Sequence, residues 1–488
     1  MNRTRVFSSS RSPVRFSVFL LLAVLPAALA AGPAGEKRRV DSAGVYVTSK
    51  GSSDRIARKE AAVFGPLEQP DEHAPTIILD RDKTFQSLVG IGGALTDASA
   101  ETFYRLPRAR QEELLTALFD RIRGNGYSLC RTSIHSCDFS SASSSYAETP
   151  GDTLLTTFSI ARDMKFKIPF IKAAFATAGE GFRLFASPWS PPGWMKSNGE
   201  MLHGGTLLPR YRQVWADYFV RFVREYEKEG IPLWGLTVQN EPMAVQPWES
   251  CIFTAAAERD FVRDYLGPTL EKGGLSGLKL MAWDHNRGLM YQRAKVMFDD
   301  PLASRYVWGT AFHWYVGDHF ENVRLVHDAY PEKALVFTEG TVENFNAARI
   351  GEWSLGETYA RSMIHDLNNG ASGWVEWNVL LDERGGPNHV GNFCMAPIIC
   401  DTKTGTVTYL SSFYYLGHFS KFIRPGARRI IASSNADDLL ATAFQNSDGT
   451  IAVVVLNATA KEITFVAWLE GKGCTVISPA RSIVTLVL

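Results

Sequence analysis

The chain has 488 residues and an ordinary globular composition, with 45% hydrophobic and 21% charged residues. This composition excludes a disordered or collagen-like chain, and the length allows two domains around a sizeable core. The 51 basic and 51 acidic residues balance to zero formal charge, so we expect no nucleic-acid partner of the kind that strongly basic proteins bind.

The first thirty residues have the pattern of a secretory signal peptide. Four arginines accompany an apolar run at 16–29, and Ala28-Leu29-Ala30 has the small residues of a cleavage site. The run is short for a membrane span, which needs about 20 residues, although an uncleaved anchor is the competing interpretation. We therefore predict a soluble mature protein of the secretory pathway, either lysosomal or extracellular.

The six cysteines are too sparse for a small disulfide-stapled fold. No CxxC pair occurs, so neither a zinc ribbon nor a thioredoxin motif is indicated. Their spacing leaves open whether the thiols are free or form one or two bridges. One glycosylation sequon, Asn457-Ala458-Thr459, adjoins an apolar run that reads as a strand, which disfavours its occupancy.

From about residue 85, short apolar runs alternate with longer helical patterns. The helical patterns include 109–122, 211–229 and 255–271, and the strand patterns are 89–92, 127–131, 182–187, 234–239, 278–283, 307–312, 334–338 and 373–378. Eight strands alternating with helices predict an α/β fold, a (β/α)8 TIM barrel. An open doubly wound sheet is the structural rival, but its usual GxGxxG and GxxxxGK[ST] motifs are absent.

The last part of the chain is rich in short β-strand patterns. After a helical pattern at 409–422 they lie at 429–433, 439–446, 451–456, 463–468, 474–477 and 483–488, with Ser447-Asp448-Gly449 as a hairpin turn. These runs predict an accessory β-sandwich, to which N-terminal runs at 45–47 and 76–80 add strands, although 32–62 reads as loosely ordered. The predicted organisation is a signal peptide at 1–30, an N-terminal segment at 31–84, the barrel at 85–425 and the C-terminal sandwich at 426–488.

Two glutamates directly follow strands of the predicted barrel. Glu241 lies in Asn240-Glu241-Pro242 after the fourth strand, and Glu339 follows the seventh. The C-terminal ends of barrel strands surround one pocket. A single glutamate there is more often a salt bridge or helix cap, but two at matched positions suit glycoside hydrolysis. One carboxyl protonates the leaving oxygen and the other faces the anomeric carbon, and their separation, which decides retention or inversion, is not given by the sequence.

These segments resemble glycoside hydrolase family 30 over roughly residues 76–488. The likeness rests on Leu236-Thr237-Val238-Gln239-Asn240-Glu241-Pro242 and, in order along the chain, on Gly92-Gly93-Ala94-Leu95-Thr96-Asp97, Ser136-Cys137-Asp138-Phe139-Ser140, Ala186-Ser187-Pro188-Trp189, His313-Trp314-Tyr315 and Gly373-Trp374-Val375-Glu376-Trp377-Asn378. Within the family it is greatest to enzymes that hydrolyse glucosylceramide. The resemblance implies a retaining β-glucosidase that releases glucose and ceramide and needs no cofactor.

The resemblance also implies a role for each matched residue. Glu241 corresponds to the general acid/base and Glu339 to the nucleophile. We expect apolar or anionic neighbours to raise the pKa of Glu241, and the Tyr315 hydroxyl to hold Glu339 ionised. The expected contacts to the glucose ring are Asp138, Trp189, Asn240, Trp377 and Asn392, for each of which packing at the barrel rim is the alternative.

Other features of the sequence do not decide the identity of the leaving group. The chain has Asp284-His285-Asn286-Arg287 where glucosylceramide-cleaving members have Asp-Asp-Gln-Arg, and the stretch at 199–209 is shorter. The substrate is thus a glycolipid, with peripheral contact to a membrane surface, or another β-glucoside, and dependence on an activator protein stays open. A metal role for His313 is not expected, since no second ligand follows at a recognised spacing.

Three other functions are weighed against this one. A secreted β-glucanase of the same family would share both glutamates. A non-catalytic carbohydrate- or lipid-binding barrel predicts a lost carboxylate, whereas both are present. A serine hydrolase is disfavoured because no GxSxG motif occurs.

Overall fold

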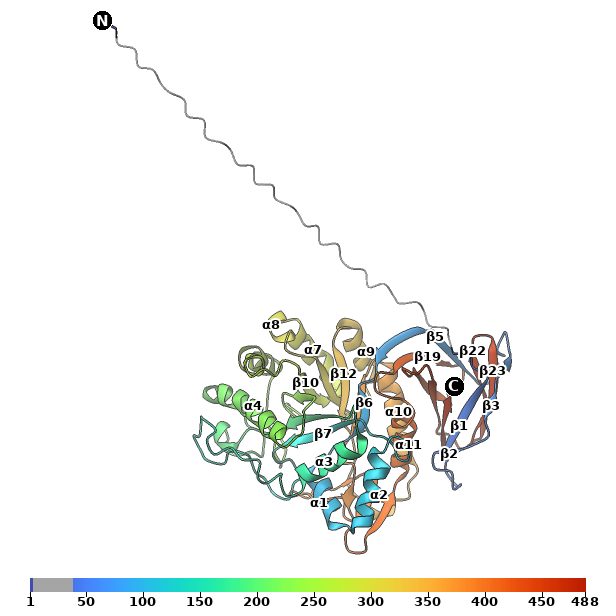
Figure 1. Ribbon diagram of the computed structural model, residues 1–488, viewed down its shortest axis with the longest axis horizontal. Coiled ribbons are helices and arrows are strands. Elements are labelled where there is room, and N and C mark those ends of the chain that lie inside the picture. Colours follow the sequence, from blue (N-terminus) through green and yellow to red (C-terminus); the bar gives the residue numbers. More distant parts are fainter. Residues whose placement is uncertain (3–37) are drawn as a thin grey trace. The chain divides into compact units, whose positions relative to one another are not determined.

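The computed structural model describes residues 38–488 together with Met1 and Asn2. The predicted signal peptide therefore lies, except for those two residues, outside the described part of the chain. Val40–Leu488 form one unit, drawn in colour in Figure 1. Among the described residues, no helix has both the length and the apolar character to span a bilayer.

Eight parallel strands form a barrel that follows chain order. The strands are β6 (Gly90–Gly93), β7 (Leu129–Ile134), β8 (Arg183–Pro188), β9 (Gly235–Thr237), β10 (Lys279–Asn286), β11 (Gly309–His313), β12 (Ala334–Glu339) and β14 (Gly373–Glu376). They pair in the order β6-β14-β12-β11-β10-β9-β8-β7. A parallel bridge between Ala94 and Arg131 joins the first strand to the second and nearly closes the barrel. Each of the eight predicted strands is present, with ends shifted by a few residues.

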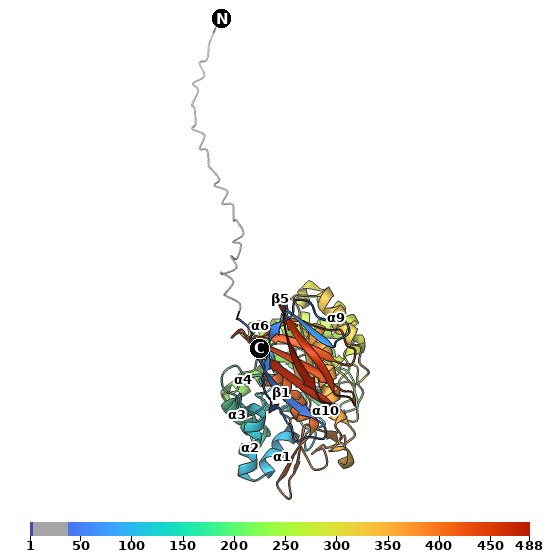
Figure 2. The ribbon, with the colours of Figure 1, turned by 90° about the vertical axis from the view of Figure 1, so that its right-hand side faces the viewer.

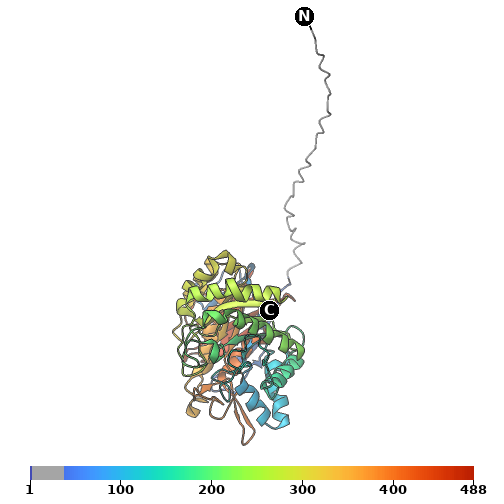
Figure 3. The ribbon, with the colours of Figure 1, turned by 90° about the vertical axis from the view of Figure 1, so that its left-hand side faces the viewer.

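Helices follow the barrel strands and cover their outer side (Figures 1 and 3). They are α1 (Asp97–Arg105), α2 (Arg108–Phe119), α3 (Lys167–Ala178), α4 (Arg212–Lys228), α5 (Ala255–Phe261), α6 (Gly267–Lys272), α7 (Met290–Phe298), α8 (Pro301–Ser304), α9 (Phe320–Ala329), α10 (Ser354–Asn368) and α11 (Ser411–Ser420). Side-chain caps fix two starts: Thr96 accepts from the N–H of Ser99 at α1, and Thr254 from that of Ala257 at α5.

Two predicted helices differ from the observed ones for local reasons. The helix predicted at 109–122 ends at Phe119, because the Asp120 carboxylate accepts the N–H groups of Ile122 and Arg123 at 2.9 and 2.8 Å and forms a turn. The helix predicted at 255–271 is interrupted by a π-helical turn at Val262–Leu266. Pro268 follows that turn and has no N–H to donate, so the wider turn accommodates a missing helical bond.

A second β-structure is built from both ends of the described chain (Figure 2). Its strands are β1 (Ser42–Ser49), β2 (Ala57–Arg58), β3 (Ala62–Val63), β4 (Gly65–Pro66), β5 (Thr76–Ser87), β19 (Arg428–Ser434), β20 (Leu440–Gln445), β21 (Ile451–Asn457), β22 (Ile463–Leu469), β23 (Lys472–Ser478) and β24 (Ser482–Val487). They are ordered β2-β1-β24-β21-β20-β19-β5-β22-β23-β4, with β3 on β1. Alternate residues, such as Val45 and Val47, bury their side chains in a separate apolar core. This is the predicted β-sandwich.

Short strands also occur in the loops after the later barrel strands. They are β13 (Val342–Glu343), β15 (Leu381–Asp382), β16 (Cys394–Met395), β17 (Ile398–Asp401) and β18 (Thr406–Tyr409). β13 pairs with β16, which ties the loop after Glu339 to the segment that carries Asn392.

The structure corrects the expectation for residues 32–62 and shows the state of the six cysteines and of Asn457. The stretch 32–62 is not loosely ordered throughout, because β1 pairs with β24 from Gly44 to Ser49 and with β3 at Ser42 and Ala43. All six cysteines lie in the described range, where they are buried and unpaired. Asn457 is buried and its amide donates to the carbonyls of Lys461, Ser478 and Pro479, so the folded structure has no room for a glycan on this side chain.

Polar side chains join the barrel to the β-sandwich. His418 on α11 lies between the hydroxyls of Thr485 and Thr48, at 2.8 and 2.9 Å. Arg481 makes a bidentate ion pair of 2.6 Å bonds with Glu357 on α10.

Apolar residues such as Phe185 and Met281 fill the barrel interior below the C-terminal ends of its strands. The open end of the barrel is therefore the C-terminal one.

Candidate active site

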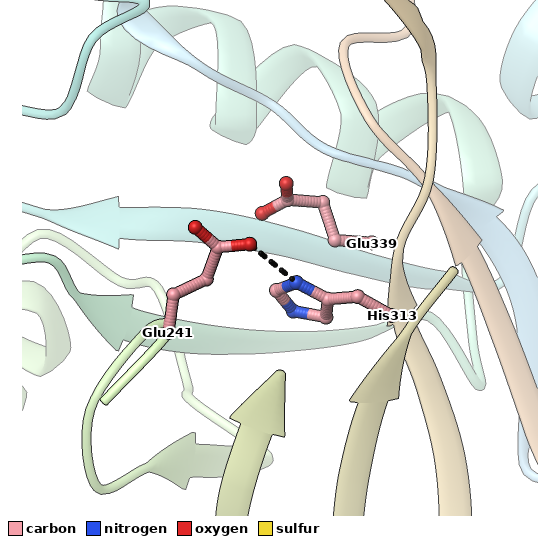
Figure 4. Close-up of side chains that lie close together, drawn as sticks. All are labelled: Glu241, His313 and Glu339. Atoms are coloured by element: carbon pink, nitrogen blue, oxygen red, sulfur yellow. Dashed lines mark hydrogen bonds and ion pairs between the residues drawn. The ribbon is translucent and has the colours of Figure 1, made fainter. Parts of the chain in front are cut away.

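Both predicted catalytic glutamates lie at the C-terminal end of the barrel (Figure 4). Glu339 is the last residue of β12, His313 is the last residue of β11, and Glu241 follows β9. One carboxylate oxygen of each glutamate and a ring nitrogen of His313 all lie within 4.8 Å of one another. The two carboxyls therefore face the same small volume, as the sequence predicted for one glycosidic bond.

The backbone at Glu241 is held in an unfavourable conformation. Its φ is 47°, in the left-handed region that non-glycine residues rarely occupy. Its N–H donates to the carbonyl of Asp284 at 2.9 Å, which ties this turn to the end of β10. Such strain is typical of functional sites, where the surrounding structure maintains it.

A buried arginine at the centre of the site connects four strands. Arg131 on β7 is fully buried and donates to Glu339 at 2.5 Å, Asp284 at 2.7 Å, Asn240 at 2.9 Å and Ser187 at 3.0 Å. The fixed geometry of its donors orients the Glu339 carboxylate and the Asn240 amide together. Burying this charge is tolerable only because two carboxylates compensate it.

Asp284 is the second centre of this network. It accepts from Thr237 and Thr338 at 2.6 Å, and its other contacts are Arg131 and His313, whose Nε2 is 3.0 Å away. Burial raises the pKa of Asp284, but Arg131 and His313 outweigh this effect and hold it well below its usual value. A permanently ionised Asp284 therefore fixes both cationic neighbours.

The Glu339 carboxylate is supplied with donors on both oxygens. Arg131 donates to Oε2, and the Tyr315 hydroxyl donates to Oε1 at 2.8 Å, as expected for Tyr315. Burial raises the pKa of Glu339 and the facing Glu241 raises it further, while His313, Arg131 and Tyr315 lower it; the net shift is upward. The donors thus oppose the penalty that burial places on the anion without overcoming it. The Tyr315 contact is as expected, but the expectation that it holds Glu339 ionised is not met by the direction of this pKa shift.

The surroundings of Glu241 differ from the expected apolar or anionic ones, and that expectation is wrong. Its Oε1 lies 3.3 Å from Nδ1 of His313 and 3.9 Å from Nε2 of His285. Burial raises its pKa, but His313 and His285 outweigh burial and the net shift is downward. Burial lowers the pKa of His313, yet Glu339, Asp284 and Glu241 raise it to about 9.

Proximity couples the two carboxyls. Two carboxyls this close disfavour double ionisation, so their titrations are coupled and the apparent pKa values belong to the pair. His313 thus influences which glutamate carries the proton, a control that the sequence did not reveal.

The predicted glucose contacts gather on the other side of the site. The Asn392 amide donates to Asp138 at 3.0 Å, and the rings of Trp189 and Trp377 stack with centroids 5.2 Å apart. Burial raises the pKa of Asp138 to about 8, although the Asn392 hydrogen bond opposes it. Asn388 donates to the same oxygen of Asp138, Oδ2, at 3.3 Å, so amides rather than a cation hold this carboxyl.

All eight predicted site residues line one cavity of about 250 Å³. They are Asp138, Trp189, Asn240, Glu241, Tyr315, Glu339, Trp377 and Asn392. Further lining residues that sequence reasoning did not assign to the site include Gln246, Trp248, Thr341, Glu343 and Cys394. A cavity of this size suits a single sugar ring with part of its leaving group.

Sequence reasoning missed the network beneath this cavity. Arg131 gave a signal, since it is a charged residue inside an otherwise buried strand. His313 was considered only as a metal ligand. Among the described residues, Glu241, His313 and Glu339 have the proximity of metal ligands, but Arg131 already supplies Glu339 with the positive charge that an ion would bring.

Two opposed carboxyls at the ends of the fourth and seventh strands of a parallel barrel, beside a sugar-sized cavity, define the protein as a glycoside hydrolase. The glycosyl hydrolase family 30 TIM-barrel model matches residues 88–423, and the family 30 beta sandwich model matches residues 426–486. The chain belongs to glycoside hydrolase family 30.

Curated relatives and a solved structure agree with this assignment. Putative glucosylceramidase 3 of Caenorhabditis elegans is 35% identical over 89% of this chain and 86% of its own length. Lysosomal acid glucosylceramidase of Mus musculus is 37% identical over 79% and 78%. An endo-1,6-beta-D-glucanase of Neurospora crassa is 28% identical over 78% and 80%. The crystal structure of SrfJ from Salmonella typhimurium has a TM-score of 0.87 at 32% identity, over 92% of this chain and 99% of that one.

Proposed function

We propose that the protein is a retaining β-glucosidase that hydrolyses glucosylceramide to glucose and ceramide. The observation that carries this proposal is the approach of the Glu241 and Glu339 oxygens to within 4.8 Å. Carboxyls about 5–5.5 Å apart support direct attack and retention, whereas inverting enzymes need roughly 6.5–9.5 Å to admit a water molecule.

The proposed mechanism is a double displacement. The pKa shifts favour the proton on Glu339 in the free protein, so the mechanism requires it to lie on Glu241 once the substrate is bound. A carboxylate oxygen of Glu339 then attacks the anomeric carbon while Glu241 transfers its proton to the glycosidic oxygen, so that the bond to the aglycone breaks and ceramide leaves. Glu241, now a carboxylate, takes a proton from water, whose oxygen attacks the anomeric carbon. The ester to Glu339 breaks and β-glucose is released.

The network beneath the cavity assists both steps. Arg131 and Tyr315 stabilise Glu339 each time it carries a full charge. Asn240, oriented by Arg131, is placed to contact the 2-hydroxyl of the sugar, an interaction that strengthens in the transition state.

Exposed apolar side chains in segments that follow β9, β10 and β11 support a lipid leaving group. The loop after Glu241 carries Met243 and Val245 at 48% and 65% exposure, and the loops after β10 and β11 carry Leu289 and Val316 at 51% and 63%. Exposed apolar side chains on neighbouring loops are typical of contacts with lipid or protein. We infer that they meet the acyl chains, or the membrane surface, beside the bound headgroup, in a lysosomal or secreted enzyme.

Hydrolysis of two substrates tests the proposal. The purified protein is incubated with glucosylceramide in detergent micelles and, separately, with β-1,6-glucan. The released sugar, whether glucose or an oligosaccharide, is measured together with the anomer first formed at its reducing end by NMR. We expect β-glucose from the glycolipid. Release from the glucan alone would refute the lipid assignment, and initial α-glucose would refute retention.

Labelling tests the nucleophile independently of the lipid. A cyclitol epoxide of glucose configuration should form an ester with Glu339, mapped by peptide mass spectrometry, and Glu339→Gln should prevent it. Label on another residue would refute the assignment of Glu339.

A β-1,6-glucanase is the second candidate, and the similarity to the Neurospora crassa enzyme favours it. The polar residues Gln246, Asn286 and Glu343 at the cavity could receive a second sugar. The same two-substrate comparison separates this candidate from the first.

A further inference from the structure

His285 is brought to the cavity by an irregularity at the end of β10. The pairing of β10 with β11 shifts register between Trp283 and His285, which marks a bulge. Trp283 and Asp284 both have left-handed backbones, with φ of 77° and 51°. In a regular strand, neighbouring residues point to opposite faces, but a bulge re-aims them. Here Asp284 enters the network of Arg131 while His285 reaches the cavity wall.

The His285 ring is held in place by its neighbours. Its centroid lies 5.0 Å from that of Trp283 at a tilt of 37°, and the Arg293 guanidinium lies 4.7 Å over the Trp283 ring. The Trp283 indole N–H donates to the carbonyl of Asn286 at 3.1 Å. The side chain of His285 is 13% exposed, so only a small part of it faces the cavity.

The surroundings of His285 determine which nitrogen carries its proton. Burial lowers its pKa to about 4, with His313 and Arg293 acting in the same direction against Glu241, so the ring is neutral above that pH. Nδ1 is buried and has no hydrogen-bond partner among the described residues, whereas Nε2 lies 3.9 Å from Oε1 of Glu241. A buried N–H without an acceptor is costly. The proton is therefore on Nε2, which makes it a donor beside the acid/base.

The order of the barrel strands indicates which part of the substrate lies near the Nε2–H of His285. The glucose contacts Asp138, Trp189 and Trp377 follow β7, β8 and β14. His285 lies on β10, with β9 and β11 as its neighbours, across the barrel from β14 and β7. Glu241 lies between the two groups, where it must meet the glycosidic oxygen. What lies beyond that oxygen, toward His285, is the leaving group.

We propose that His285 is a specificity-determining residue for the leaving group, whose Nε2–H donates to an aglycone oxygen close to the scissile bond. In ceramide, such oxygens belong to the amide and hydroxyl groups that follow the glycosidic carbon. The inference rests on the proposed hydrolysis and deepens it. Aglycones with a polar oxygen near the glycosidic bond are favoured over plain alkyl chains through this contact.

Three substitutions and three substrates test the proposal. His285→Phe removes both nitrogens, His285→Gln keeps a donor near Nε2, and His285→Asn puts its donor near the buried Nδ1. The substrates are glucosylceramide, n-octyl β-glucoside and β-glucosyl fluoride, with His73→Phe, an exposed histidine far along the chain, as the control.

We expect His285→Phe and His285→Asn to lower kcat/KM for glucosylceramide about three- to tenfold relative to octyl glucoside, the effect of one neutral hydrogen bond. His285→Gln should restore the ratio, and glucosyl fluoride and His73→Phe should be unaffected. An equal loss on glucosylceramide and octyl glucoside, with glucosyl fluoride spared, would mean that His285 acts through Glu241. An equal loss on all three substrates would mean a general disturbance of the site. Either result leaves the ratio unchanged in His285→Phe and would overturn the proposal.

A failure of the proposed function gives a different result. Wild-type protein would then cleave octyl glucoside or glucosyl fluoride but not glucosylceramide. Gentiobiose, which has hydroxylated carbons beside the scissile bond, then replaces the lipid. An unchanged ratio of gentiobiose to octyl glucoside in His285→Phe would overturn the role of His285 in that case too.

Discussion

Tyr315→Phe removes one donor from the proposed nucleophile and leaves the shape of the site intact. The lost bond, 2.8 Å from the Tyr315 hydroxyl to Oε1 of Glu339, is a hydrogen bond to a charged group and contributes about 1.5–3 kcal/mol. Glu339 regains its charge as the glycosyl-enzyme breaks down, so the missing donor slows that step. At about 1.4 kcal/mol per factor of ten, its rate should fall about ten- to hundredfold.

The pH profile gives a second, independent readout. Tyr315 lowers the pKa of Glu339, so its removal raises that pKa and the ionised form is lost at a higher pH. We therefore expect the acid limb of the kcat/KM profile to move upward in pH.

Steady-state kinetics on β-glucosyl fluoride test both effects, because its good leaving group makes breakdown of the glycosyl-enzyme the slow step. Tyr330→Phe is the matched control: its hydroxyl donates to Asp299 at 2.7 Å, but at the surface and away from the cavity. It should leave kcat and the pH profile unchanged. If Tyr315→Phe also keeps both wild-type values, Tyr315 does not support Glu339.

Three further predictions follow from the same contacts. Glu241→Gln should lower kcat for glucosides with poor leaving groups about 10²- to 10⁴-fold. It should spare the first step with glucosyl fluoride, and added azide should restore turnover of that substrate by forming β-glucosyl azide. No rescue by azide would contradict the acid/base role. Asp138→Asn should lower kcat/KM about tenfold or more without changing the melting temperature, because it replaces a carboxyl oxygen that can accept from a sugar hydroxyl with an NH₂ group that cannot. Unchanged kinetics would place Asp138 outside the sugar site. Burial lowers the pKa of His418 to about 3. As the pH drops below about 6.5, the unfolded chain therefore binds a proton at this residue that the folded chain does not. The free energy of unfolding should fall by about 1.4 kcal/mol per pH unit in this range. His418→Gln should therefore weaken the loss of melting temperature between pH 6.5 and 4.5, and an unchanged slope would refute this.

The barrel could be predicted from the sequence because its pattern is local. Each parallel strand is buried on both faces and reads as an apolar run, while the amphipathic helices between them have a different period. Local patterns predict the ends of helices less well. The Asp120 turn shortens α2, and the π-helical turn before Pro268 divides the predicted helix at 255–271. The pairing of β1 with β24 was beyond reach, because it joins the two ends of the described chain.

Site residues were predictable where they lie in a recognisable local motif. Glu241 and Glu339 follow apolar runs, and the structure brings them together. The ion network of Arg131 and Asp284 was not predictable, since its partners come from different strands and only the closed barrel makes them neighbours. The positive φ of Trp283 also has no glycine to signal it. For this reason His285 could be noted as a departure from the family but not placed beside the acid/base.

The position of β24 between β1 and β21 constrains how the molecule assembles. During synthesis, β1 emerges early, whereas β24, its main neighbour, is made only after the whole barrel and the other strands of the sandwich. An apolar strand exposed for that time offers an unpaired edge to other chains. Chaperone binding would shield it, and shortening the chain before Ser482 should give an aggregating product even though the hydrolytic centre is complete.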